Sequence, residues 1–71
     1  MDHQETGIVK WFDSTKGYGY IKSDHGGDVF VHYSAVVCEE SDCSLEEGNR
    51  VKFNIIQTPK GPQAQDVIVL N

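Results

Sequence analysis

Six of the seven aromatic residues of this 71-residue chain lie between Lys10 and Tyr33. Two clusters of turn-forming residues, Asp13-Ser14-Thr15-Lys16-Gly17 and Asp24-His25-Gly26-Gly27, divide this stretch into short pieces. The pieces themselves are rich in aromatic and β-branched residues, which is typical of strands. A chain of this length has room for one small core. The rings must therefore either form that core or be exposed together on a surface.

The rest of the chain continues the pattern of short strands. Residues 34–50 are polar and acidic and have no helical stripe, so they are expected to form a long, exposed and mobile loop. Within that loop, Ser44-x-x-Glu47 followed by Gly48 could support one capped helical turn and no more. We expect one domain over residues 1–71 with an all-β fold, a small five-stranded antiparallel barrel whose closure removes the exposed sheet edges. The predicted strands are residues 6–12, 18–23, 28–33, 51–57 and 63–70.

Alternation along the strands separates an inner face from an outer face. Both faces of residues 28–33 carry bulky side chains, whereas a single-layer barrel has only one interior. An inward His32 would need buried hydrogen-bond partners, so the aliphatic set makes the better core. The orientation of Trp11 stays open, because strict alternation would bury it whereas a bulge near Lys10 would expose it. Alternation also places Tyr33 inside the barrel. The expected inner set is Val9, Gly19, Ile21, Val29, Val31, Val51, Phe53 and Ile55, and the expected outer set is Tyr18, Tyr20, Phe30 and His32.

An exposed face of rings with lysines at its edge is rare on soluble monomers unless it has a use. Taken singly, each ring can be explained as a cross-strand pair that stabilises the sheet by roughly 0.2–1 kcal/mol. Taken together, flat rings stack on nucleobases, and each stacked base contributes roughly 1–3 kcal/mol with little sequence preference. Duplex bases are already stacked on each other, so the outer face predicts a single-stranded ligand.

Charge and cysteine content limit the other possibilities. The net charge is −5, and much of it lies in the acidic run Glu39, Glu40, Asp42, Glu46 and Glu47, which reads as a solvated surface. Neither a membrane-spanning run nor a secretory signal is evident, so the expected compartment is the cytosol, where Cys38 and Cys43 would be free thiols. The cysteines and His3, His25 and His32 lack the usual metal-ligand spacings, so we expect no metal and no cofactor. No catalytic constellation appears, and so short a chain has little room for a closed pocket, so we expect no enzymatic activity.

Two motifs connect this pattern to a known family. Lys16-Gly17-Tyr18-Gly19-Tyr20-Ile21 resembles the first ribonucleoprotein motif, and Val29-Phe30-Val31-His32-Tyr33 resembles the second. With Lys10-Trp11-Phe12 before them and Lys60-Gly61-Pro62-Gln63-Ala64 after them, nearly the whole chain resembles a bacterial cold-shock protein. The resemblance implies an OB-type barrel that binds single-stranded RNA and DNA, acts as an RNA chaperone, and in some members regulates transcription.

The resemblance also implies a set of site residues. It moves Trp11 and Tyr33 to the binding surface, and it assigns hydrogen-bonding positions to Asp13 and Gln63. Tyrosine replaces the family's usual phenylalanine at positions 18, 20 and 33, and the loop around Cys38–Ser44 lacks the usual aromatic residue, which predicts a shorter footprint on that side. The implied stacking residues are Trp11, Phe12, Tyr18, Tyr20, Phe30, His32 and Tyr33, and the implied basic contacts are Lys10, Lys16 and Lys60.

Of three other interpretations of the same residues, two stay open at this point. An RNA-recognition-motif fold is excluded by the motif order and by the lack of segments for its two helices. A protein-interaction barrel could use the same aromatic patch for a protein partner. A small metal or redox module could be built on Cys38, Cys43 and a histidine. We expect a monomer that has neither a membrane nor a small molecule as its target.

Overall fold

The computed structural model describes residues 4–37 and 45–70 and confirms an all-β closed barrel. No helix within these residues is long and apolar enough to cross a membrane. One 3-10 turn, η1 (Tyr33–Ala35), follows the third strand. The five strands are β1 (Gln4–Asp13), β2 (Tyr18–Ser23), β3 (Asp28–His32), β4 (Arg50–Thr58) and β5 (Gly61–Val69).

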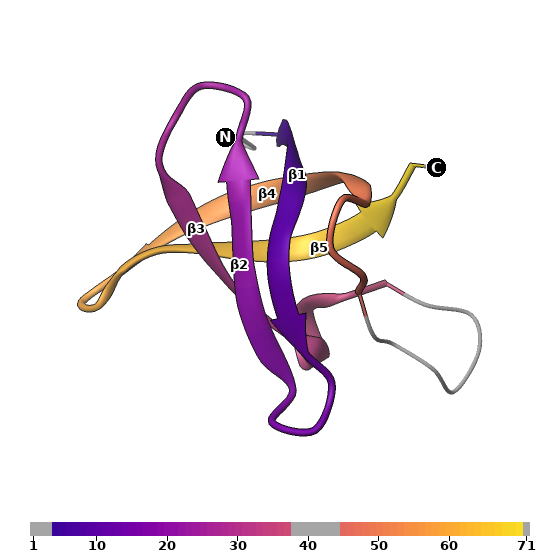
Figure 1. Ribbon diagram of the computed structural model, residues 1–71. Coiled ribbons are helices and arrows are strands. Elements are labelled where there is room, and N and C mark those ends of the chain that lie inside the picture. Colours follow the sequence, from indigo (N-terminus) through magenta and orange to yellow (C-terminus); the bar gives the residue numbers. More distant parts are fainter. Residues whose placement is uncertain (1–3, 38–44, 71) are drawn as a thin grey trace.

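The strands are arranged around the barrel in the order β1-β2-β3-β5-β4, with β4 returning to β1. Figure 1 shows β1, β2 and β3 side by side, with the β4–β5 hairpin crossing them at a steep angle. All neighbouring pairs are antiparallel except β3 and β5, which meet in parallel at Phe30 and Gln63. The parallel contact arises because a long connection, and not a tight turn, links β3 to the β4–β5 hairpin.

The barrel interior has the aliphatic composition that alternation predicts. Ile55 is only partly buried, although it packs against the interior. Gly19 is buried where β1 and β2 approach so closely that a Cβ on Gly19 would lie 2.2 Å from the carbonyl oxygen of Trp11. The buried apolar residues are Val9, Ile21, Val29, Val31, Leu45, Val51, Phe53, Ala64 and Val67.

The prediction that the whole segment 34–50 is an exposed, mobile loop is wrong for the parts that the structure describes. Leu45 is only 4% exposed and belongs to the core. The backbone of Gly48 and Asn49 bonds both the carbonyl and the N–H of Val9, at 2.9 Å each. Val36 forms a bridge with Val67. These contacts attach the described parts of the segment to β1 and β5, which the local polarity of the sequence does not indicate. Residues 45–49 form a turn and no helix.

A bulge in β1 decides the orientation of Trp11. Val9 pairs with Ile21, but Trp11 pairs with Tyr20, so the register shifts at Lys10. The extra residue turns the Trp11 side chain onto the outer face beside Tyr20, where it is 39% exposed. Of the two alternatives for Trp11, the bulge that exposes it is therefore the one observed.

The inward placement of Tyr33 by alternation is wrong. β3 ends at His32, and the chain turns into η1 at Tyr33. Period-two alternation holds only within a strand. Tyr33 is 53% exposed, and its ring lies over Gly17, where a Cβ would approach the ring to 2.7 Å.

A polar cluster connects the turn after β2 to β1 and β4. Thr6 donates its hydroxyl to the carboxylate of Asp24, and Arg50 Nη2 donates to the same oxygen at 3.3 Å. The backbone N–H of Asp24 also donates to the carbonyl of Thr6 at 3.0 Å. The hydroxyl of Thr6, and then the charge of Arg50, hold the pKa of Asp24 below its ordinary value of 3.8.

This lowered pKa predicts an acid-sensitive contribution to stability. A carboxylate whose folded pKa is depressed stabilises the fold above its unfolded pKa, and the contribution is lost as the pH falls through the folded pKa. Asp24→Asn should therefore be less stable than wild type at pH 7, and the gap should close below about pH 4. Urea unfolding over a pH series measures this gap, with Thr6→Val as the control that removes the main donor. A gap that stays constant down to pH 2 would contradict the prediction.

Candidate nucleic-acid interface

Four aromatic rings from three strands form a continuous cluster on the outer face. Trp11 contacts Tyr18 and Tyr20, with ring centroids 6.1 and 5.6 Å apart. Phe30 closes the cluster from the other side, at 5.8 Å from Tyr18 and 5.6 Å from Tyr20. Two of the four contacts are edge-to-face, and the other two are tilted. Each ring is therefore held in place by two neighbours while one side remains open to solvent.

Strand register is what brings these rings together. Tyr20 pairs with Phe30 across β2 and β3, and with Trp11 across β1 and β2. Tyr18 pairs with His32 on the same face. Tyr18, Tyr20, Phe30 and His32 are half-buried, while Ile21, Val29 and Val31 on the opposite face are fully buried. The predicted division into two faces is thus observed.

His32 and Tyr33 form a second aromatic unit at the end of β3. Their ring centroids are 4.6 Å apart, with 38° between the ring planes. The backbone N–H of Tyr33 donates to the carbonyl of Gly17 at 2.8 Å, which ties this unit to the turn after β1. Asp13 shapes that turn, because its Oδ1 accepts the N–H groups of Thr15 and Lys16 at 2.9 and 3.0 Å. If Asp13 contacts a ligand as expected, it does so with a carboxylate that also accepts these two hydrogen bonds within the turn.

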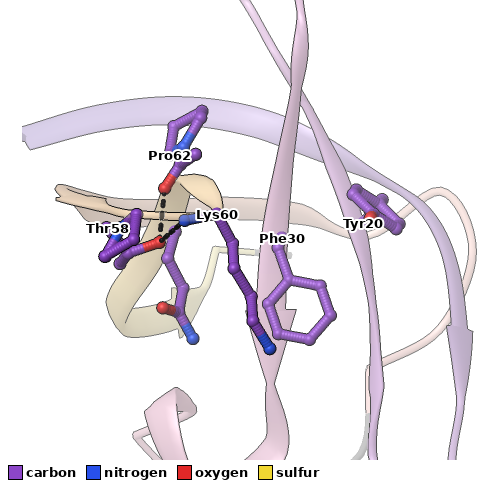
Figure 2. A pocket seen from close by; sticks show the side chains of 8 residues that line it. Tyr20, Phe30, Thr58, Lys60 and Pro62 are labelled. Atoms are coloured by element: carbon purple, nitrogen blue, oxygen red, sulfur yellow. Dashed lines mark hydrogen bonds between the residues drawn. The ribbon is translucent and has the colours of Figure 1, made fainter.

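A groove of about 540 Å³ extends the aromatic cluster toward the β4–β5 turn. Figure 2 shows Tyr20 and Phe30 on one side, with Thr58, Lys60 and Pro62 of the turn on the other. The hydroxyl of Thr58 accepts the backbone N–H of Lys60 at 3.2 Å and donates to the carbonyl of Gly61 at 2.8 Å, which fixes the turn. Gln63, another residue expected at the site, also lines the groove.

The three lysines expected at the site have different surroundings. Lys60 lines the groove, and Lys16 is exposed in the turn between β1 and β2. Lys10 forms an ion pair with Asp28, with Nζ 3.1 Å from Oδ2. Because both partners are solvent-exposed, this pair is weak and can exchange Asp28 for a phosphate at little cost.

Phe12 does not lie with the other expected stacking residues. It pairs with Gly19, whose position is on the inner face, and its partly buried side chain packs against the core. A stacking role for Phe12 thus has less support from the geometry than that of Trp11.

The sequence analysis did not assign Thr58, Pro59 or Pro62 to the site. The sequence shows that these residues belong to a turn with two prolines and a glycine, but it does not show where the turn lies. Closure of the barrel places the turn beside Phe30. The expectations for Cys38, Cys43, His3 and the acidic residues 39–42 lie outside the described residues. Within the described part of the chain, no three potential metal ligands come together.

Comparisons with known proteins point to one family. A family model described as the "Cold-shock" DNA-binding domain matches residues 5–70. The chain is 51% identical to cold shock-like protein CspA of Vibrio cholerae over 71 residues, which cover 99% of this chain and 100% of the relative. It is 56% identical to a cold shock-like protein of Thermotoga maritima over 64 residues, covering 90% and 96%. Cold shock protein CspB of Geobacillus stearothermophilus is 50% identical over 66 residues, covering 93% and 98%.

Proposed function

The chain belongs to the cold-shock domain family of nucleic-acid-binding proteins, and from this membership we propose that it binds single-stranded RNA and DNA by stacking bases on its outer aromatic face. The observation that carries the proposal is the cluster of Trp11, Tyr18, Tyr20 and Phe30, whose rings contact one another and remain partly open to solvent. Rings held in this way lose little conformational freedom when a base stacks on them.

Two aromatic units and a groove offer successive sites for a flexible strand. Bases would stack on the four-ring cluster and on the His32–Tyr33 pair, while the groove beside Phe30 would receive one more base. Three or four stacks of roughly 1–3 kcal/mol each are sufficient for micromolar to nanomolar affinity after the cost of association. Lys16 and Lys60 lie at the edges, where they would contact phosphates.

The biological role that follows from this binding mode is that of an RNA chaperone and a regulator of transcription or translation. A protein that binds unpaired bases and not duplexes shifts the equilibrium of an RNA hairpin toward its open form by mass action. Binding alone is sufficient for this role, so we propose a cytoplasmic, non-enzymatic monomer. Stacking with little sequence preference would let it act on many transcripts.

Fluorescence of the single tryptophan tests the proposed function directly. Trp11 is 39% exposed and belongs to the cluster, so stacking of a base should quench its emission. We expect saturable quenching by oligo-dT and oligo-U and much weaker quenching by the corresponding duplexes. If single strands leave the emission unchanged, the aromatic face is better explained as a surface for a protein partner.

The salt dependence of binding should be shallow. Three lysines near the aromatic face can neutralise about three phosphates, and each contributes a log–log slope of roughly −0.7 on a single strand. The expected slope is therefore about −2. Titrations of oligo-dT between low and high salt measure it. A slope steeper than about −4 would mean that phosphate contacts, and not stacking, dominate the affinity.

A further inference from the structure

Among the rings of the outer face, only His32 and Trp11 have a ring nitrogen that can donate a hydrogen bond to a ligand. Its two ring nitrogens have different surroundings. Nδ1 lies 2.9 Å from the hydroxyl oxygen of Ser34 and 3.3 Å from the backbone nitrogen of Ser34. In the described part of the chain, both hydrogen-bond contacts of the His32 ring are made at Nδ1, and none reaches Nε2.

The two contacts of Ser34 together favour one position for the ring hydrogen of His32. A backbone N–H can only donate, so this contact requires an Nδ1 that accepts and carries no hydrogen. A neutral imidazole with an unprotonated Nδ1 carries its hydrogen on Nε2. The hydroxyl of Ser34 must then donate to Nδ1 as well. The same contact makes His32 the N-cap of η1, with extended backbone angles (φ −112°, ψ 149°) that suit this role.

We propose that Ser34 is a positioning residue that holds His32 in the Nε2–H form, so that His32 presents an N–H donor to the bound strand in addition to its stacking face. This inference rests on the proposed function, because the acceptor would be an oxygen of the single strand. The oxygen belongs either to a base carbonyl or to a phosphate, and both accept an N–H bond in the same way. The Tyr33 ring, 4.6 Å away, supports one face of the imidazole and limits how the ring can turn.

The first test uses the free protein and needs no nucleic acid. The ¹⁵N chemical shifts of a histidine ring distinguish a protonated from an unprotonated nitrogen. We expect wild-type His32, assigned by its absence in His32→Asn, to show an unprotonated Nδ1 and a protonated Nε2 near neutral pH. Ser34→Thr, which keeps the hydroxyl, should preserve this pattern. Ser34→Ala keeps the backbone N–H but loses the shorter contact of the hydroxyl at 2.9 Å, so it should populate the other tautomer more. A predominantly Nδ1–H wild type, or a Ser34→Ala spectrum identical to wild type, would overturn the proposal.

The second test measures binding. His32→Phe keeps a flat ring but has no N–H, so its affinity for oligo-dT should fall about fivefold, which corresponds to one hydrogen bond of about 1 kcal/mol. Oligo-dA distinguishes the two acceptors, because adenine has no carbonyl oxygen whereas thymine does. A loss confined to oligo-dT identifies a base carbonyl, and an equal loss for both identifies a phosphate. Wild-type affinity for both would overturn the donor role.

A matched pair of variants separates the donor from the cap. Asparagine at position 32 places an amide near the Nδ1 position and is a favoured N-cap, whereas glutamine places its amide nitrogen near the Nε2 position. We expect His32→Gln to bind oligo-dT more tightly than His32→Asn, and equal affinities would contradict the proposal. If the wild-type protein fails to bind oligo-dT at all, the proposed function fails, while the tautomer measurement still stands as a test of Ser34.

Discussion

Replacing Phe30 by alanine should weaken the binding of oligo-dT by about 5- to 150-fold while the protein stays folded. The factor corresponds to the roughly 1–3 kcal/mol that one base–ring stack contributes. Phe30 contacts both Tyr18 and Tyr20 and also lines the groove, so its loss affects two neighbouring base sites. Tryptophan quenching gives the affinity, and urea unfolding shows whether the fold is retained.

Ile68→Ala is a suitable control for this experiment. Ile68 is an exposed apolar residue, 38% accessible, that pairs with Lys52 on a part of the barrel distant in register from the aromatic cluster. Its replacement should leave the affinity unchanged. If Phe30→Ala unfolds the protein, the ring is part of the core and the division into inner and outer faces is wrong.

Replacing Phe53 by alanine should have the opposite effect, a large loss of stability with little direct effect on binding. Phe53 is the largest fully buried side chain, at 1% exposure, and truncation of a core phenylalanine costs about 3–5 kcal/mol. A domain of this size has a total stability of roughly 4–11 kcal/mol. The variant should therefore unfold at a much lower urea concentration, and part of it should be unfolded without denaturant.

Phe53→Leu serves as the conservative control. A hydrophobic exchange of similar volume costs less than about 1.5 kcal/mol, so this variant should remain folded. Its folded form should bind oligo-dT with wild-type affinity, because Phe53 lies inside the barrel and none of the observed ring contacts involves it. An unchanged urea midpoint for Phe53→Ala would show that the interior is not packed around this ring.

Local patterns were sufficient to predict most of the barrel. The second strand, residues 18–23, has the predicted bounds, because a turn with a glycine stands on either side of it. The other four strands are present, and their ends differ from the predicted ones by at most two residues. Alternation also identified Tyr18, Tyr20, Phe30 and His32 as one face, since each strand has a period of two whatever its neighbours are.

Other features depend on contacts between distant parts of the chain. Leu45 is an apolar residue in a polar segment, and it becomes a core residue only because the folded chain packs it against the other buried residues of the barrel. The parallel pairing of Phe30 with Gln63 places the β4–β5 turn at residues 59–60 beside the rings, although more than 30 positions separate Phe30 from Gln63. The Ser34 contact that orients His32 depends on the end of β3, a boundary that alternation does not mark.

The sequence by itself determined which side chains could share a face, because alternation and turn chemistry act over a few residues. It also carried the motifs that relate the chain to the cold-shock family. Only the tertiary structure decided that the bulge at Lys10 turns Trp11 outward, that Tyr33 leaves the strand, and that the β4–β5 turn completes the groove. These outcomes follow from closure of the barrel, since strand register and long-range packing are set by all five strands together.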